Sequence, residues 1–404
     1  MTQRISVDVA ILGAGPVGGT LACRLAEAGI RTALVDRAPL PPMEHPDFDG
    51  RAYAIAAGSR SVLEQAGLWD RLPFPAGPIN AIRVSDGRVG RPPSRLFLHF
   101  DREEAGDQPF GWMVEARSLR MAINARLAAL PALSVHAPVQ ASVQRHDGGA
   151  TVTVAGGPVI DCRLVVAAEG RASPLRRQAG IRVTHLPYDQ TGMVCAVAHE
   201  QPHHGTALEH FLPGGPFAQL PMAGTAGAPH LSAIVWTERN HLARHLLALD
   251  DAAYTHELAR RLGPHLGPIR LLGRRWSYPL GAMLVHRLVD TRLAVVGDAA
   301  HGIHPIAGQG LNLGFRDIGS LAAMVIGAAR AGEDLGNPAL LRRYQTARRP
   351  DNLLMLAATD MLDRLFSNDS RILRLARDLG IAAVNRAPPL KRLFMRTAMG
   401  TLTG

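Results

Sequence analysis

The chain begins with two short apolar runs separated by one longer segment. Val7–Leu12 is rich in β-branched residues, which is typical of a buried strand in a parallel sheet. The segment from Pro16 to about Ala28 is predicted to be a helix, because Gly29 provides the usual stop after it. A second apolar run, Arg31–Val35, follows directly. The pattern therefore predicts a strand–helix–strand unit at the N-terminus.

The turn of this unit carries Gly13, Gly15 and Gly18, which fit the pattern GxGxxG. The first glycine permits a tight turn, the second lets the backbone approach a pyrophosphate, and the third lets the helix pack closely on the strand. The N-terminus of the helix offers N–H groups and the positive end of its dipole to phosphates. Asp36, at the end of the second strand, is suited to accept hydrogen bonds from ribose hydroxyls. These features predict a dinucleotide site and leave both NAD and FAD open.

Two later stretches repeat the change from a buried strand to a polar, glycine-containing turn. Leu164–Ala168 is followed by Glu169-Gly170 and by a helix that begins at Ser173-Pro174. Leu293–Val296 leads into "GDAAHGIHPIAGQGLNLGFRD", which starts at Gly297. A helix is predicted from Gln309 or Gly310 through Ile326. The glycines would let the backbone approach a ligand without an intervening side chain.

The region from Gln178 to Pro279 reads as strands separated by turns, and it predicts a mixed sheet beside a substrate pocket. Four of its side chains could line the pocket or belong to the core: Phe211, Phe217, Leu220 and Trp236. From Asn337 onward the chain reads as helices. One helical face collects apolar side chains, which would pack on the protein's own core or meet a membrane surface: Leu354, Ala358, Met361, Leu362, Leu365 and Phe366.

Composition and charge narrow the class of protein. A hydrophobic content of 47% fits a globular chain. Of the net charge of +10, the part from Arg342 to Gly404 carries +7, with twelve basic residues against five aspartates. No nucleic-acid motif accompanies this charge, so no nucleic-acid partner is expected. The cysteines are scattered and no metal site is expected. The N-terminus lacks a leader pattern, which predicts a cytoplasmic protein.

Taken together, the three glycine-containing motifs and "FDGRAYAIAAGSRSVLEQAGLWDRL" (Phe48–Leu72) resemble the FAD-dependent hydroxylases of ubiquinone biosynthesis. These belong to the flavoprotein monooxygenases typified by para-hydroxybenzoate hydroxylase. The resemblance implies an α/β fold with a Rossmann-like FAD-binding domain, an inserted mixed-sheet substrate domain and a C-terminal helical segment. The boundaries expected are 1–75, 100–180 and 280–335 for the FAD-binding domain, 76–99 and 181–279 for the substrate domain, and 336–404 for the helical segment.

The resemblance also assigns roles to residues. Asp298 is expected to bind the ribityl chain of FAD, and the helix that begins near Gly308 to Gly310 would point its N–H groups at the flavin. The usual Asp-Gly of the second motif is Glu169-Gly170 here, which puts the docking of the nicotinamide in question. The catalytic candidates are His301, His304 and Pro305. The expected FAD-binding residues are Gly13, Gly15, Gly18, Asp36, Arg37, Arg51, Arg117, Glu169, Asp298, Gly308, Gly310, Leu311 and Asn312.

The activity implied by the resemblance is hydroxylation of the aromatic ring of a polyprenylated phenol. NADH or NADPH would reduce FAD, and O2 would then form a flavin C4a-hydroperoxide that transfers oxygen to the ring. Such a substrate implies peripheral attachment to the inner face of the cell membrane, and a ubiquinone-biosynthesis complex is a further expected partner. Two alternatives stay open, namely a hydroxylase of a soluble phenol and a mainly structural flavoprotein partner in such a complex.

Overall fold

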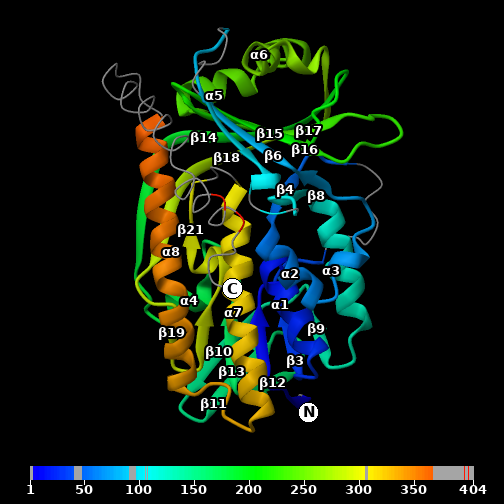
Figure 1. Ribbon diagram of the computed structural model, residues 1–404. Coiled ribbons are helices and arrows are strands. Elements are labelled where there is room, and N and C mark those ends of the chain that lie inside the picture. The colour runs from blue at the N-terminus through cyan, green and yellow to red at the C-terminus, as the bar shows by residue number, and fades with distance from the viewer. Residues whose placement is uncertain are drawn as a thin grey trace.

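In the computed structural model of this chain, residues 3–40, 48–90, 97–104, 106, 108–304 and 308–366 are described, together with Met395 and Met399. Within these residues the strands form four sheets, and long helices pack along one of them (Figure 1). The architecture is α/β, with a nucleotide-binding half at one end and a large mixed sheet at the other. The predicted fold class is confirmed.

The nucleotide-binding half is built on the predicted parallel strands. Strand β2 (Val9–Leu12) pairs in parallel with β13 (Leu164–Ala167) on one side and with β3 (Thr32–Val35) on the other. All twelve side chains of these strands are buried, which explains their continuous apolar runs. The sheet is completed by β20 (Leu293–Val295), β19 (Val289–Asp290) and β9 (Leu133–His136). All three predicted motif strands are thus neighbours in one sheet.

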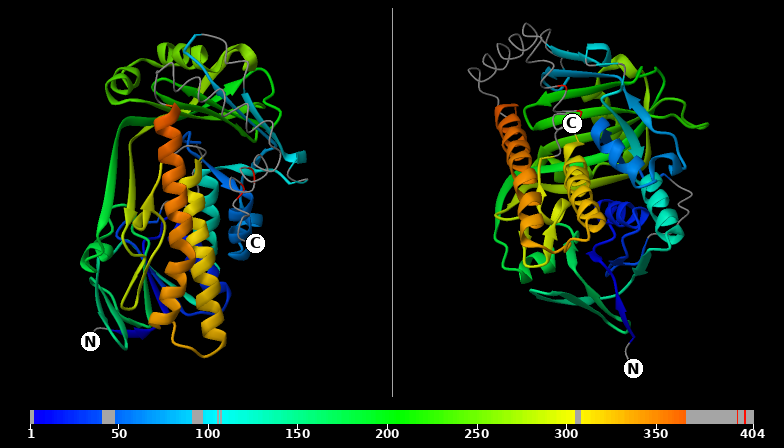
Figure 2. Two further views of the ribbon diagram at one scale, coloured as in Figure 1. Left: turned by 60° about the vertical axis from the view of Figure 1, so that its left-hand side comes forward. Right: turned by 60° about the horizontal axis from the view of Figure 1, so that its bottom comes forward.

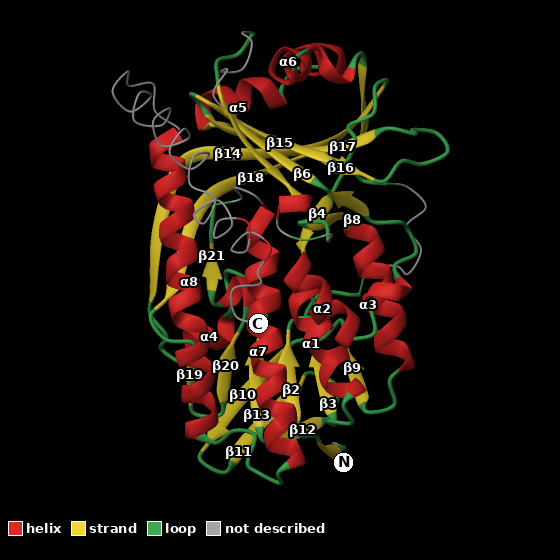
Figure 3. Cartoon of the chain, in the orientation of Figure 1, coloured by secondary structure: helices red, strands yellow, loops and turns green. Residues whose placement is uncertain are grey.

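Long helices pack along this sheet, as Figure 3 shows. Helix α1 (Pro16–Glu27) follows the first glycine turn and contacts both α3 (Ala116–Ala129) and α7 (Gln309–Arg330). Helix α8 (Pro338–Phe366) runs beside α7 in both views of Figure 2. Helix α7 ends at Arg330, four residues beyond the predicted end at Ile326, because its apolar face continues to bury Val325 and Ile326 and then Ala328.

This half also contains two smaller sheets and two short helices. A four-stranded sheet contains β1 (Arg4–Ser6), β12 (Val159–Cys162), β11 (Gly149–Val154) and β10 (Ala141–His146). A three-stranded sheet contains β4 (Ala52–Ala56), β8 (Gly111–Glu115) and β5 (Gly77–Ile79). The short helices here are α2 (Ala57–Gln65) and α4 (Pro174–Gln178).

The mixed sheet predicted for the middle of the chain has eight strands within the described residues. Their order is β21 (His301–Gly302), β18 (Ile269–Val285), β14 (Val183–His199), β17 (Leu231–Arg239), β16 (Gly215–Met222), β15 (Thr206–Leu212), β6 (Ala81–Asp86) and β7 (Phe97–Asp101). Helices α5 (Asn240–Leu247) and α6 (Asp251–Leu262) lie over its outer face (Figures 1 and 2). The inner face points toward β4 and the start of α7.

The four side chains that could line a pocket or belong to the core lie on different faces of this sheet. Phe217 and Trp236 are fully buried on the outer face, where they pack against Tyr254 of α6. They are core residues, so their proposed role as pocket lining is wrong. Leu220 lies on the inner face and packs with Ala54 of β4. Phe211 is on the same inner face, because it lies two residues from Glu209 and four from Ala207 along β15.

Candidate functional site

The first glycine turn leaves one stretch of backbone open beside the N-terminus of α1. A Cβ at Gly13 would overlap the carbonyl oxygen of Ala168, and a Cβ at Gly18 would overlap the carbonyl oxygen of Gly13. Both positions therefore require glycine for packing. Nothing lies within 4 Å of the position that a Cβ would take at Gly15. This residue also precedes the helix, and no side chain accepts hydrogen bonds from the first turn. The turn therefore fits a bound pyrophosphate, as predicted.

Asp36 is held rigidly beside this turn. Its Oδ2 accepts a hydrogen bond from the Ala14 N–H at 2.6 Å, and its Oδ1 accepts one from the Ala38 N–H at 2.8 Å. Arg120, which the sequence analysis missed, donates from Nη1 to the Ala14 carbonyl at 2.6 Å. Burial lowers the pKa of Arg120, so this cation is placed in the turn at a cost in desolvation. Arg37 is exposed.

The two predicted arginines each have a carboxylate partner and an aromatic ring. Arg51 lies 2.6 Å from Oδ2 of Asp49, and its guanidinium lies 4.3 Å from the ring centre of Trp276. Arg117 lies 2.5 Å from Oε2 of Glu115 and is over the ring of Phe74. Both are fixed at the junction of β4 and β8 with their neighbours. Their contact with FAD stays a prediction.

In the second motif the carboxylate of Glu169 accepts hydrogen bonds from residues of its own turn. Oε2 of Glu169 accepts hydrogen bonds from the Ser173 hydroxyl at 2.5 Å and from the Leu175 N–H at 3.1 Å. Glu169 thus caps the start of α4, and this structural use occupies one of its two oxygens. Arg176 joins this motif to the third one, because it donates to the carbonyls of Arg171 and Ala299. The contact of Glu169 with a cofactor stays a prediction.

The third motif returns the chain to the first glycine turn. A Cβ at Gly297 would meet the side chain of Val17 at the start of α1, and Gly297 adopts a positive φ of 58°. The next residue, Asp298, has a side chain that is 56% exposed, with Oδ2 3.8 Å from Nε of Arg171. An exposed carboxylate at this turn is available to a ligand. The structure therefore brings the predicted Asp298 beside α1.

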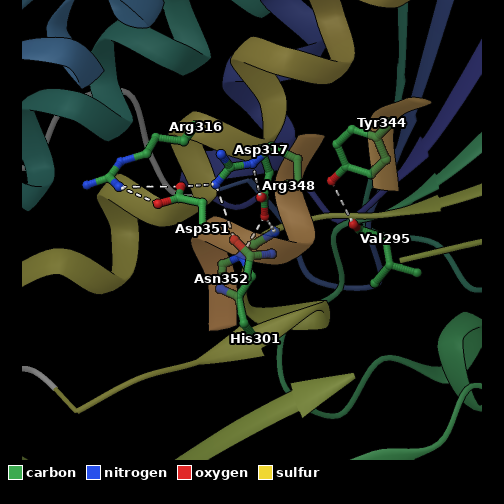
Figure 4. A network of polar contacts seen from close by, with 9 residues as sticks. Val295, His301, Arg316, Asp317, Tyr344, Arg348, Asp351 and Asn352 are labelled. Atoms are coloured by element: carbon green, nitrogen blue, oxygen red, sulfur yellow. Dashed lines mark hydrogen bonds and ion pairs between the residues drawn. The ribbon is translucent and has the colours of Figure 1, made fainter. Parts of the chain in front are cut away.

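His301 belongs to a buried network rather than to an open surface (Figure 4). Its Nε2 lies 2.5 Å from Oδ2 of Asp317, and the same oxygen accepts a hydrogen bond from the Gly297 N–H. The other oxygen of Asp317 accepts from Nε of Arg348 at 2.9 Å. Burial alone would raise the pKa of Asp317, but His301 and Arg348 outweigh it and hold this pKa below its usual value. The network locks the third motif to α7 and α8.

The start of α7 presents an open backbone toward β4. Gly308 adopts the left-handed conformation before the helix, with φ 62°, and no side chain caps the first turn. Nothing lies within 4 Å of the position of a Cβ at Gly310. Asn312 fixes this end, because its Oδ1 accepts from the Ala56 N–H at 2.9 Å and its Nδ2 donates to the Ala54 carbonyl at 2.8 Å. Leu311, between them, packs partly buried against the core.

His304 is buried at the opposite end of the inner sheet face. Its Nε2 lies 3.3 Å from Oε1 of Gln190 and 3.5 Å from Oδ1 of Asp363, and its ring contacts Tyr188 edge to face. Burial lowers the pKa of His304, and the nearby carboxylates of Asp363 and Asp360 oppose that shift. Pro305 lies outside the described residues. The catalytic roles of His301, His304 and Pro305 stay predictions.

The site therefore contains two helix N-termini whose glycines leave the backbone open, those of α1 and α7. Asp36 lies beside the glycine turn before α1, and Asp298 follows Gly297, which contacts Val17 of α1. This arrangement fits a long ligand with a pyrophosphate at one end and a planar, electron-accepting ring at the other. A family model described as "FAD binding domain" matches residues 6–358. The match spans all three motifs.

Individual relatives agree with that match. The "Ubiquinone hydroxylase UbiL" of Rhodospirillum rubrum is 51% identical, over 98% of this chain and 90% of that protein. The "3-demethoxyubiquinol 3-hydroxylase" of Escherichia coli is 33% identical, over 97% of this chain and 98% of that protein. The crystal structure of PqsL, a probable FAD-dependent monooxygenase from Pseudomonas aeruginosa, has the same fold, with a TM-score of 0.75, 23% identity, and 95% of this chain and 100% of that chain covered.

The prediction that FAD is the cofactor, rather than NAD alone, is confirmed. The chain belongs to the FAD-binding family of flavoproteins, and it has the fold of the monooxygenases typified by para-hydroxybenzoate hydroxylase.

Proposed function

We propose that this protein is an FAD-dependent monooxygenase that hydroxylates the ring of a polyprenylated phenol in ubiquinone biosynthesis, with NADH or NADPH and O2 as co-substrates. The observation that carries the proposal is the 51% identity to a ubiquinone hydroxylase along nearly the whole chain, including every motif of the site. The E. coli relative named for the same kind of reaction supports it.

The residues of the site divide the work of holding the cofactor. The N–H groups at the start of α1 would bind the pyrophosphate, Asp36 the adenosine ribose and Asp298 the ribityl chain. The start of α7 would place a positive dipole end beside the flavin ring, where negative charge is stabilised. Bound FAD supplies hydride acceptance and oxygen activation, while the chain orients the ring and keeps water away.

We further propose the domain division expected from the sequence. The FAD-binding domain would comprise residues 1–75, 100–180 and 280–335, and the substrate domain 76–99 and 181–279, followed by the helical segment 336–404. Supporting this division, the sheet of eight strands has its own core with α5 and α6. Strand β18 crosses from one part to the other as a single strand, Ile269–Val285.

A polyprenylated substrate resides in a bilayer, and the outer face of α8 supports attachment to an anionic membrane surface. The side chains of Leu354 and Met361 are 57% and 68% exposed, and Leu353 and Leu362 are exposed beside them. About one to three turns earlier the exposed side chains are Arg349, Arg343 and Arg342. No described helix is long and apolar enough to span a membrane. We therefore propose reversible attachment through this face at the inner side of the cell membrane.

The attachment predicts sedimentation with vesicles that contain phosphatidylglycerol at low salt and release at high salt, because exposed charges are screened. Equal binding to neutral vesicles, without an effect of salt, would contradict it.

The expected ubiquinone-biosynthesis complex is a second partner, and co-purification of other enzymes of the route with the tagged protein tests it.

Deletion of the gene tests the function itself. The proposal predicts that cells without the protein lose ubiquinone and accumulate a prenylated precursor that lacks one ring hydroxyl, identified by mass spectrometry. Complementation with the wild-type gene should remove the precursor. Unchanged ubiquinone, in cells that have no second hydroxylase of this family, would overturn the proposal.

A further inference from the structure

Glu209 lies on the inner face of the sheet of eight strands. In β15 it pairs with Ala218 of β16 on one side and with Val84 of β6 on the other. Paired residues share a face of a sheet. The next residue, His210, pairs with Phe217, which belongs to the outer core with α5 and α6. Glu209 therefore points away from those helices and toward the nucleotide-binding half.

The cross-strand row that contains Glu209 is otherwise apolar. From β14 to β7 its other members are Val194, Val235, Ala218, Val84 and Leu98. No hydrogen bond or ion pair joins the carboxyl of Glu209 to another described residue. The residue is half-buried, and Ala207, two residues away on the same face of β15, belongs to an apolar cluster that includes Met395 and Met399. A carboxyl without a hydrogen-bond partner in such an apolar row carries a desolvation cost, so its presence calls for another explanation.

The row lies between two parts of the candidate site. The adjacent row on one side includes Ala196, Ala233 and Leu220, which pack with Ala54 of β4. Ala54 also faces Gly308 at the start of α7. On the other side, Gln190 of β14 donates to the Gly214 carbonyl and contacts His304. Glu209 thus faces the region between the flavin end of α7 and His304.

Burial alone raises the pKa of Glu209 to about 7. Other titratable side chains at this inner face, within the described residues, are Asp86, diagonal to Glu209 on β6, and, beyond β14, His304, Tyr188, Asp360 and Asp363. Base catalysis is most effective when the pKa of the base lies near the working pH. The carboxyl is therefore able to exchange a proton at neutral pH.

The geometry points to Glu209 as the catalytic base that accepts the proton of the phenol hydroxyl during ring hydroxylation. This inference rests on the proposed function, which supplies the phenol and, from O2 and NAD(P)H, the oxygen and two electrons. As the ring carbon bonds to oxygen, the phenol O–H bond breaks and its proton passes to Oε of Glu209. The electron pair of that bond forms the carbonyl of a hydroxylated dienone.

The ring then recovers its aromaticity. Its carbon loses the original hydrogen as a proton, while the carbonyl oxygen regains a proton from Glu209. The carboxylate is restored, and the released proton contributes to the water formed from the second oxygen atom. One further proton is taken up from solvent, and the products are a ring with one added hydroxyl, water and NAD(P)+, so atoms and electrons balance.

The test compares Glu209→Gln with the wild type, both loaded with FAD, using a phenol that bears a farnesyl chain in detergent micelles. The glutamine keeps the size of the side chain but cannot accept the proton. We expect kcat for ring hydroxylation to fall about 100-fold, as for other general bases, with KM changed little. NAD(P)H oxidation should continue with release of hydrogen peroxide. Glu238→Gln is the matched control, because Glu238 belongs to the same sheet and faces Arg261 of α6 on its outer side.

The pH profile separates catalysis from a structural effect. A base works only when deprotonated, so wild-type kcat/KM should rise with pH through about 7, the pKa of Glu209. Glu209→Gln should lose this rise, and Glu209→Asp should retain it at a lower rate. A Glu209→Gln enzyme with wild-type kcat and pH profile would overturn the assignment alone. A wild-type enzyme that never hydroxylates the phenol would overturn the proposed function, and the assignment with it.

Discussion

Asp317 shows how one residue can determine the shape of a site without touching its ligand. It is fully buried, and it meets Gly297 at the third motif, His301 in β21 and Arg348 in α8. The sequence predicts a role for His301 but none for Asp317, because the partner Arg348 lies 31 residues away on another helix. Local spacing carries no information about such a contact.

Asp317→Asn should therefore destabilise the fold. The amide leaves Arg348 as a buried cation with one charged partner fewer, and breaking a buried pair typically costs about 3–5 kcal/mol. Urea unfolding should show this loss in the free energy of unfolding. Glu64→Gln is the control, because Glu64 pairs with Arg60 at an exposed position of α2 and should cost less than about 1 kcal/mol. Equal losses in the two variants would argue against the buried network.

Asp298→Ala tests the predicted contact with the ribityl chain. A charge-assisted hydrogen bond contributes about 1.5–3 kcal/mol, so FAD affinity should fall by about tenfold to a hundredfold. Flavin fluorescence during titration of the apoprotein measures the affinity. Because the side chain is mostly exposed, stability without FAD should not change. A variant that binds FAD as tightly as the wild type would remove Asp298 from the site.

His210 should make stability depend on pH. Burial lowers its pKa to about 4, while the unfolded chain keeps a value near 6.5. Between these values the unfolded state binds more protons, so the free energy of unfolding falls as the pH falls. From pH 7.5 to 5 the loss should be about 2 kcal/mol. Urea unfolding of His210→Asn, which can still bond Ser85, should show a smaller loss; an identical loss would contradict the assignment.

At the scale of elements, most of the nucleotide-binding half was predictable from sequence. Strands β2, β3, β13 and β20 are short continuous apolar runs, and turns such as the one at Gly13 mark where each strand ends. The large sheet was harder to predict. Its strands were found, but the face of each strand depends on pairing between distant segments, such as β15 with β6. For that reason the sequence leaves Trp236 open between core and pocket, and it indicates no role for Glu209.

The apolar face of α8 is a second feature for which the sequence left two alternatives open. Its spacing was recognised, but spacing alone does not tell whether a face is covered. Leu354, Met361 and Leu362 are exposed, so packing of this face on the protein's core is wrong for these residues. The neighbouring buried face of α8 contains Met355 together with the polar Asn352, Thr359 and Asp363, so this part of it is more polar than the buried face of an ordinary surface helix. Leu365 and Phe366, predicted for the same face, have side chains outside the described residues.

Replacing Leu354 and Met361 together by glutamine should weaken binding to anionic vesicles about tenfold or more, because burying each such side chain contributes about 1.5 kcal/mol or more when complete. Sedimentation with vesicles measures the effect. Thr346→Gln, on the exposed side of the same helix, is the control. Thermal unfolding of the double variant should match the wild type. Undiminished vesicle binding would place the membrane contact elsewhere.

At the scale of the whole molecule, two halves meet across one region. The nucleotide-binding half supplies the open starts of α1 and α7, and the large sheet supplies an inner face that is mostly apolar. Hydroxylation of an apolar phenol requires both, a fixed flavin and a dry surface to hold the ring against it. The proposed membrane contact, the outer face of α8, belongs to the same molecule, so the proposed substrate would pass from the bilayer to the cofactor site within one protein.

The most direct test of this account is a single reaction under isotopically labelled dioxygen. The purified FAD-loaded protein is mixed with NADPH or NADH and a farnesylated phenol, and the products are analysed by mass spectrometry. The account predicts one labelled oxygen atom on the aromatic ring for each nicotinamide oxidised in the coupled reaction. Nicotinamide oxidation that releases only labelled hydrogen peroxide, with the phenol recovered unchanged, would contradict it.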